Sequence, residues 1–164
     1  MLQNIKSSLL HVCSALAKHQ VNYLIIGGTA VGLYGYFRPS VSDFGDLIDK
    51  PDIDIWYQPT YENYFKVLRV MGEFEYDVTD FLTEQTPNPK SSYFKLEFDN
   101  FSLDLIPGIV ANIDFFDAYK RKEVISVEGV EIFVMNYVDL ITDKEATGRK
   151  KDLEDIKHLR SLKK

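Results

Sequence analysis

Two carboxylates at alternate positions of one short apolar segment are the feature of this sequence that most clearly indicates chemistry. Asp52 and Asp54 alternate with Ile53 and Ile55, a pattern typical of a strand. Successive side chains of a strand point to opposite faces, so both carboxylates project from one face. Mg²⁺ takes oxygen ligands and is usually held by one or two carboxylates together with substrate phosphates. The pair therefore predicts a site for a divalent cation, Mg²⁺ or Mn²⁺, and a nucleoside triphosphate.

A glycine turn upstream of the acids predicts the place of the phosphates. The apolar run 23–26 ends in Gly27 and Gly28 and continues into Thr29, which indicates a buried strand that turns sharply into a helix. Glycines let the backbone approach a phosphate closely, and the first N–H groups of a helix attract anions. We therefore expect Gly27, Gly28 and Thr29 to bind the β and γ phosphates.

A third acid lies inside a later apolar segment, where it needs a partner. Asp104 lies between Leu103 and Leu105 in the segment 101–106. An ionised carboxylate in such a place is costly unless it is paired, hydrogen-bonded or bound to a metal. Strand alternation places the two leucines on the core face and Asp104 on the opposite face. The alternative is an edge-strand acid that faces water.

Together these motifs resemble the nucleotidyltransferase superfamily related to DNA polymerase beta, in its minimal, bacterial-type form. The family's glycine motif is matched by residues 26–28 and its acid pair by residues 52–55. In that family a third acid comes from a later strand beside the pair, and Asp104 is the matching position. The resemblance implies that Asp52, Asp54 and Asp104 are the catalytic, metal-binding residues.

The spacer between the two motifs departs from the family's pattern. Gly28 and Asp52 are separated by 23 residues, against roughly a dozen in the usual motif. Residues 37–40 resemble the Arg-x-Ser/Thr that normally precedes the acids, which makes Arg38 a predicted nucleotide-binding residue. The segment 41–51 is then an expected insertion.

The C-terminal part of the chain extends the resemblance over most of the sequence. Small members of the superfamily commonly end in Lys-x3-Gly-Arg-x-Lys-Asp-x2-Asp, which is matched here by Lys144, Gly148, Arg149, Lys151, Asp152 and Asp155. The resemblance implies that Lys144 or Arg149 reaches the triphosphate. The alternative is a charged helix face that is simply solvated.

Composition restricts the class of protein. With 164 residues, 45% of them hydrophobic, the chain suits one globular domain, 1–164, with a real core. A net charge of −6 argues against a protein that coats nucleic acid by charge, which leaves nucleic acid only as an acceptor. The single cysteine, Cys13, excludes a disulfide framework and a cysteine-based zinc site. No apolar run approaches the roughly twenty residues of a membrane span, and we expect a cytoplasmic protein with no membrane partner.

The hydrophobic periodicity predicts an α+β fold: a nucleotidyltransferase-like mixed β-sheet flanked by helices, with C-terminal helices. Helices are predicted over residues 2–19, 29–36, from 60 onward, 114–120, 136–148 and from 149 onward. Strands are predicted over residues 23–26, 52–56, 93–98, 101–106, 123–127 and 130–134, with a further strand and turn within 74–82. The turns at residues 99–100 and 128–129 predict two hairpins.

These motifs suggest one reaction. Asp52 and Asp54 would hold one metal on the triphosphate, and Asp104 would join them around a second metal that activates an acceptor hydroxyl. Attack at the α phosphorus would release pyrophosphate, a reaction that depends on positioning and charge neutralisation rather than on an enzyme nucleophile. The acceptor stays open: a protein hydroxyl, an RNA end, or a small alcohol such as an aminoglycoside.

Two other functions compete with this hypothesis. In the first, the fold is kept as a non-catalytic module that binds nucleotide or a partner protein, and the long spacer favours it because misplaced acids would slow the reaction. Toxin and antitoxin components occur among small members of the superfamily, so a protein partner is expected by analogy. The second is a metal-dependent phosphohydrolase, which is disfavoured because no histidine lies near the acids in the sequence.

Overall fold

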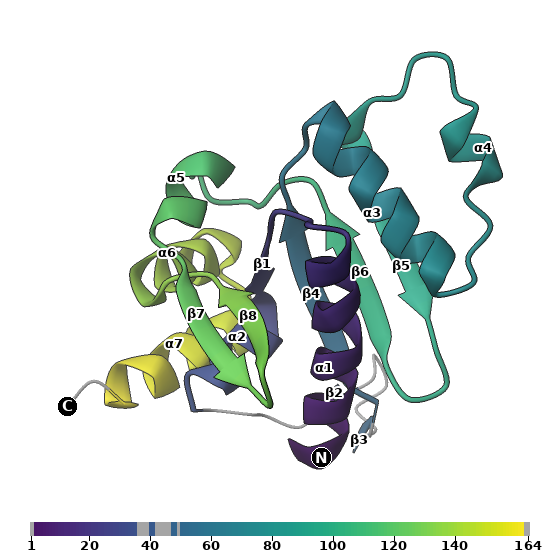
Figure 1. Ribbon diagram of the computed structural model, residues 1–164. Helices are drawn as coiled ribbons and strands as arrows, with labels where there is room; N and C mark the ends of the chain where they lie inside the picture. Colours follow the sequence, from purple (N-terminus) through teal and green to yellow (C-terminus); the bar gives the residue numbers. More distant parts are fainter. Residues whose placement is uncertain (1, 36–39, 42–46, 49, 163–164) are drawn as a thin grey trace.

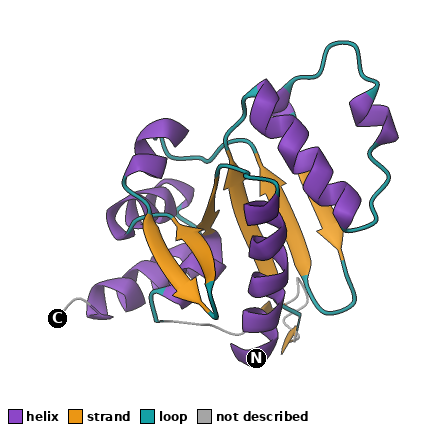
Figure 2. Ribbon diagram, in the orientation of Figure 1, coloured by secondary structure: helices purple, strands orange, loops and turns teal. Residues whose placement is uncertain are grey.

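The computed structural model describes residues 2–35, 40–41, 47–48 and 50–162, and these form a mixed sheet with helices on both sides (Figures 1 and 2). The strands of the main sheet are β1 (Tyr23–Ile26), β4 (Asp52–Tyr57), β5 (Phe94–Glu97), β6 (Ser102–Ile106), β7 (Glu123–Val127) and β8 (Val130–Val134). The helices are α1 (Leu2–Lys18), α2 (Gly27–Leu33), α3 (Tyr61–Glu73), α4 (Thr79–Leu82), α5 (Phe115–Lys120), α6 (Tyr137–Thr147) and α7 (Lys150–Leu162), with a 3₁₀ turn at Pro89–Ser91. The predicted α+β class with C-terminal helices is confirmed.

The order of the strands places the acid-bearing strands next to each other. The sheet runs β5-β6-β4-β1-β8-β7. β4 pairs antiparallel with β1 and parallel with β6, while β8 runs parallel to β1. The two predicted hairpins, β5–β6 and β7–β8, form the two edges of the sheet. The sheet is therefore mixed, as the sequence predicts.

Helices cover the sheet in two groups. α1 and α3 contact each other and lie in front of the sheet in Figure 1. α2, α6 and α7 contact one another and lie behind it. The strand residues that alternate with the acids, Ile53, Ile55, Leu103 and Leu105, are fully buried in the core. The alternation of apolar and acidic residues thus gives β4 and β6 one apolar and one polar face.

Local sequence signals set the ends of two helices. Thr60 precedes α3, and its side chain accepts a hydrogen bond from the Asn63 N–H. Asn136 caps α6 in the same way through the Asp139 N–H. Gly148 ends α6 in the left-handed conformation, with φ of +59°. These ends agree with the predicted ones. By contrast, α2 begins at Gly27, two residues before the predicted start.

The strand predicted within residues 74–82 is wrong. Phe74 ends α3, and Thr79–Leu82 forms the short helix α4. The Asp77 carboxylate accepts from the Thr79 N–H at 3.0 Å and from its hydroxyl at 2.6 Å, which favours a turn. The Phe81 ring packs on Phe94 of β5, with ring centroids 5.1 Å apart. Phe81 therefore packs against the edge strand of the sheet from a short helix and not from a strand of its own.

The expected insertion at 41–51 lies only partly within the described residues. Two short strands, β2 (Ser40–Val41) and β3 (Leu47–Ile48), pair antiparallel there, apart from the main sheet. Arg38, a predicted nucleotide-binding residue, lies outside the described residues. Across the described ranges, no helix combines the length and the apolar character needed to cross a membrane.

Candidate metal and nucleotide site

The structure brings together the three acids that the sequence indicates. β4 and β6 pair in a parallel register that places Asp54 beside Asp104 and Asp52 beside Ser102. One carboxylate oxygen from each of Asp52, Asp54 and Asp104 lies within 4.8 Å of the other two. All three therefore project from the polar face of the sheet toward one point, which is the arrangement that a shared cation needs.

The hydrogen bonds around the acids leave room for a cation. Asp104 Oδ1 is buried, yet among the described residues no group donates a hydrogen bond to it. Its nearest cation is Lys95 Nζ at 3.7 Å, which is longer than a hydrogen bond. Asp52 Oδ1 accepts one bond, from Ser102 Oγ at 2.7 Å. A buried acceptor without a donor needs an explanation, and a bound metal ion supplies one.

The position of Asp54 within the cluster shifts the pKa of its carboxyl group. Burial, followed by the negative charges of Asp52 and Asp104, raises the pKa of Asp54 to about 8. Desolvation and nearby like charges both disfavour the ionised form. A divalent cation between the three carboxylates would reverse this effect, because it favours the ionised form of each ligand. The residues present therefore fit a hard divalent cation.

The glycine of the turn is required by its position beside Asp54. Ile26 at the end of β1 pairs with Asp54 on β4, so Gly27 comes next to the carboxylate. Gly27 has φ of +67°, and a Cβ there would lie 2.5 Å from Asp54 Oδ2. Both the left-handed backbone and the close approach exclude a side chain. The glycine motif and the acid pair, which are far apart in the sequence, thus form one structural unit.

A hydrogen bond from Thr29 connects the glycine turn to the acid-bearing strand. The Thr29 hydroxyl donates to the Asp52 carbonyl oxygen at 3.0 Å. This contact joins the start of α2 to β4 directly, despite the 23 residues that separate Gly28 from Asp52. The long spacer therefore does not move the acids away from the glycine turn.

A cleft of about 920 Å³ contains the site. Its lining includes every predicted site residue that the structure describes, namely Gly27, Gly28, Thr29, Asp52, Asp54, Asp104, Lys144 and Arg149. Residues from β1, α2, β4, β6, α6 and the start of α7 thus meet in one cavity.

Solved structures with the same architecture exist. The lincosamide antibiotic adenylyltransferase LnuA, bound to lincomycin, matches with a TM-score of 0.59 and 16% identity, over 95% of this chain and 96% of that one. A putative nucleotidyltransferase from Thermotoga maritima matches with a TM-score of 0.55 and 18% identity, over 94% and 89%. This chain has the nucleotidyltransferase fold. The antibiotic-resistance factor ANT(2'')-Ia matches with a TM-score of 0.57 and 15% identity, over 94% and 82%. No protein-family model matches the sequence, and a search of curated proteins finds no match.

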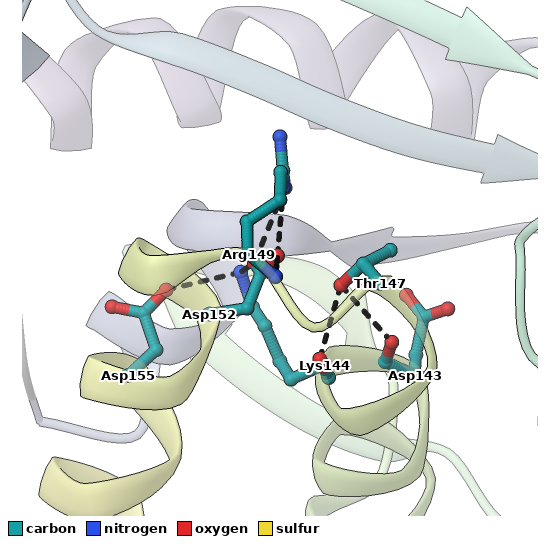
Figure 3. Close-up of polar contacts among 6 residues, drawn as sticks. All are labelled: Asp143, Lys144, Thr147, Arg149, Asp152 and Asp155. Atoms are coloured by element: carbon teal, nitrogen blue, oxygen red, sulfur yellow. Dashed lines mark hydrogen bonds and ion pairs between the residues drawn. The ribbon is translucent and has the colours of Figure 1, made fainter.

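In this nucleotidyltransferase fold, the two predicted cations of the C-terminal helices differ in accessibility. The Lys144 side chain is only 4% exposed, and its Nζ lies 3.1 Å from Asp152 Oδ1 and 3.0 Å from Asp155 Oδ2 (Figure 3). The Arg149 side chain is 57% exposed. The alternative prediction, a charged helix face that is simply solvated, is therefore wrong for Lys144. Arg149 is the better placed of the two to contact a ligand.

Sequence reasoning missed one residue on the edge strand β5 and one directly before it. Lys95 pairs across the strands with Asp104, and Tyr93, which is 54% exposed, also lines the cleft. The signal was present in the predicted hairpin. A turn at residues 99–100 sets Lys95 opposite Asp104, and alternation places residue 93 on the same face.

Another acid of the cleft gave no signal in the sequence. Asp143 on α6 lines the cavity and is almost fully buried. Its Oδ1 accepts from the Ala111 N–H at 3.3 Å, which fastens the loop after β6 to α6. Burial raises the pKa of Asp143, partly offset by this hydrogen bond and by Lys144. Only the packing of the loop against the helix reveals this residue.

Proposed function

We propose that the protein is a metal-dependent nucleotidyltransferase, which moves a nucleoside monophosphate from a nucleoside triphosphate to an acceptor hydroxyl and releases pyrophosphate. One observation carries the proposal: Asp52, Asp54 and Asp104 converge around a buried oxygen without a donor, directly beside a glycine that admits no side chain. The nucleotidyltransferase fold supports the same reaction class.

Asp52, Asp54 and Asp104 are the proposed ligands of the cation. Their donors are all carboxylate oxygens, which suit Mg²⁺ and Mn²⁺ better than softer metals. When bound, the cation neutralises charge on the phosphates and activates the acceptor hydroxyl. The raised pKa of Asp54 is consistent with a carboxylate that loses its proton when a metal ion binds.

Other residues of the chain position the triphosphate. The backbone of Gly27, Gly28 and Thr29 lines the cleft next to the acids and allows phosphates to approach closely. Arg149 offers guanidinium donors, which pair well with phosphate oxygens. Because Lys144 is buried against two carboxylates, we propose that it supports α7 rather than the ligand. Arg38 stays a prediction.

A small-molecule alcohol is the acceptor that we propose to test first. The cleft volume of about 920 Å³ lies within the range of small-molecule sites, roughly 300–1,000 Å³. Two proteins of the same fold are a lincomycin-bound adenylyltransferase and an antibiotic-resistance factor. A protein hydroxyl and an RNA end are the other acceptor classes, and a partner protein of the toxin–antitoxin kind stays a prediction.

The test is an acceptor screen with α-labelled ATP, GTP, CTP and UTP, in Mg²⁺ or Mn²⁺. Lincomycin, an aminoglycoside, a short RNA and the protein itself serve as acceptors. We expect labelled nucleotide on one acceptor class and an equal amount of pyrophosphate. Binding of a triphosphate without any transfer would instead support the non-catalytic module. Release of inorganic phosphate alone would indicate a phosphohydrolase.

A further inference from the structure

Four charged side chains form a balanced cluster where α6 meets α7. Lys144 and Arg149 supply two positive charges, and Asp152 and Asp155 supply two negative ones. Figure 3 shows that the residues come from the end of α6, the connecting turn and the first turns of α7. Asp152 is fully buried, although it borders the cleft, whereas the Arg149 side chain is more than half exposed.

Asp152 lies at the centre of this cluster. Its Oδ2 accepts from Arg149 Nε at 2.7 Å and from the Arg149 backbone N–H at 3.1 Å. Its Oδ1 accepts from Arg149 Nη2 at 3.2 Å and from Lys144 Nζ at 3.1 Å. Each carboxylate oxygen of Asp152 therefore accepts two hydrogen bonds. Burial alone would raise the pKa of Asp152, but the hydrogen bonds from Arg149 and Lys144 outweigh it and hold the pKa well below its usual range.

The two-point contact fixes the direction of the guanidinium. A planar guanidinium that gives Nε and Nη2 to one carboxylate has little rotational freedom left. In Figure 3 the end of the Arg149 side chain projects away from the two helices, with its remaining nitrogen directed away from Asp152. Arg149 lines the cleft and is close enough to Asp54 for that acid to raise the pKa of Arg149, after the larger effect of Asp152. Arg149 thus lines the same cleft as Gly27, Gly28 and Thr29, the proposed phosphate site.

Helix capping alone does not explain the geometry. Asp152 is the third residue of α7, and its bond to the Arg149 backbone N–H is one half of a capping box. That role needs a single oxygen and no guanidinium. The hydrogen bonds that Asp152 accepts from Arg149 Nε and Nη2 are not needed for capping. They connect the capping residue to a side chain that lines the cleft.

We infer that Asp152 is a positioning residue, which orients the Arg149 guanidinium for the triphosphate and is itself braced by Lys144. The inference rests on the proposed function, because it assigns Arg149 to the triphosphate of that reaction. It gives Lys144 an indirect part in binding: its Nζ fixes Asp152 Oδ1, and Asp152 fixes Arg149.

The test uses a substitution for which charge and orientation predict opposite results. Asp152→Asn removes a negative charge near the cleft, so by Coulomb's law alone it would strengthen the binding of an anion. The asparagine has the same shape but only one acceptor oxygen, so it cannot hold both guanidinium nitrogens. We expect the Kd of MgATP, measured by calorimetry, to rise about tenfold. An unchanged or lower Kd would overturn the inference.

Three further variants and a control sharpen the result. Glu154→Gln makes the same charge change at an exposed position of α7 and should leave the Kd unchanged. Arg149→Ala should raise it about tenfold, and adding Asp152→Asn to that variant should raise it by no more than about twofold. Arg149→Lys keeps the charge but loses the two-point contact, so its Kd should also rise. Wild-type affinity in Arg149→Lys would overturn the inference even if Asp152→Asn did not fold.

A readout without nucleotide separates this inference from the proposed function. In the wild type the Arg149 Nε–H proton should exchange slowly with water by NMR, since it is bonded to a buried carboxylate. In Asp152→Asn that protection should be lost. Fast exchange in the wild type would refute the orientation. A protected proton in a protein that fails to bind MgATP would instead refute the proposed function and leave the orientation standing.

Discussion

Two clusters of carboxylates, each with at least one member that lines the same cleft, differ in how their charge is balanced. On the sheet, Asp52, Asp54 and Asp104 converge, and among the described residues only Lys95 forms an ion pair with one of them, 3.7 Å from Asp104. On the helices, Asp152 contacts Lys144 and Arg149, and Asp155 contacts Lys144, at 2.7–3.1 Å. The first cluster keeps an excess of negative charge, whereas the second is neutral within itself.

The difference indicates separate roles for the same type of side chain. The pKa of Asp54 is raised to about 8, which means that its charge is a cost in the metal-free protein. The pKa of Asp152 is held below its usual range, which means that its charge is stabilised by the protein's own cations. An unbalanced cluster suits an external cation, whereas a balanced one suits a scaffold.

The largest expected effect comes from removing a charge on the sheet. Asp52→Asn and Asp54→Asn keep the side-chain size but remove a proposed metal ligand. We expect nucleotidyl transfer to fall by about 100-fold or more, since even groups that only orient metal ligands contribute up to that factor. The metal-free protein should melt at the same or a higher temperature, because repulsion is relieved.

Asp99→Asn, in the exposed turn between β5 and β6, provides the matched control and should keep full activity. Full transfer activity in Asp52→Asn or Asp54→Asn would show that the acids are not the metal ligands.

The helix cluster should respond in the opposite way to loss of one member. Lys144→Met leaves the buried acids Asp152 and Asp155 without their shared cation. Breaking a buried ion pair in this manner costs roughly 3–5 kcal/mol. Urea unfolding should therefore show a large loss of stability in Lys144→Met and little change in Lys150→Met, an exposed position at the start of α7. Equal stability of the two variants would mean that the cluster is not a scaffold.

Metal addition should act on the sheet cluster alone. We expect Mg²⁺ to raise the melting temperature of the wild type, and more so when MgATP can bind, because a ligand of the folded state stabilises it. The rise should be larger at pH 8.5 than at pH 6, since protons compete for Asp54, and EDTA should abolish it. An equal Mg²⁺ response in Asp54→Asn would place the metal elsewhere.

The pH dependence of the metal-free protein follows from the same carboxyl group. Because the pKa of Asp54 rises from 3.8 to about 8 on folding, the folded protein holds more protons than the unfolded chain between these values. The contribution of Asp54 to stability is thus present at low pH and is lost as the pH rises through about 8. Melting curves at several pH values should show this loss in the wild type but not in Asp54→Asn. Parallel pH profiles would contradict it.

The smallest effect is expected at Lys95, the only cation among the described residues that forms an ion pair with a sheet acid. Its side chain is about half exposed, so Lys95→Met should change stability by less than about 1 kcal/mol. The Mg²⁺ affinity should stay the same or increase slightly, because a competing positive charge is removed. A large loss of stability would mean that Lys95 balances Asp104 as fully as Lys144 balances Asp155.

Much of the fold was predictable from local sequence signals. Thr60 and Asn136 cap helices as their types predict, and the alternation in residues 52–57 and 102–106 appears as strands with one polar face. For residues 74–82 the same reasoning predicted a strand that the structure does not have. Aromatic residues favour strands and packed loops alike, and only the contact between Phe81 and Phe94 distinguishes the two.

The sequence by itself determined which side chains share a face, because that depends on the period of a strand and on the chemistry of turns. It also placed Asp104 opposite Leu103 and Leu105, and Gly27 beside a buried strand end. Only the tertiary structure decided which acids have a protein cation. Lys144 and Lys95 are both lysines near acids in space, but α7 folds over Lys144 and excludes water, whereas Lys95 lies on an open edge strand. Whether such an ion pair is buried depends on this packing, and no local pattern encodes it.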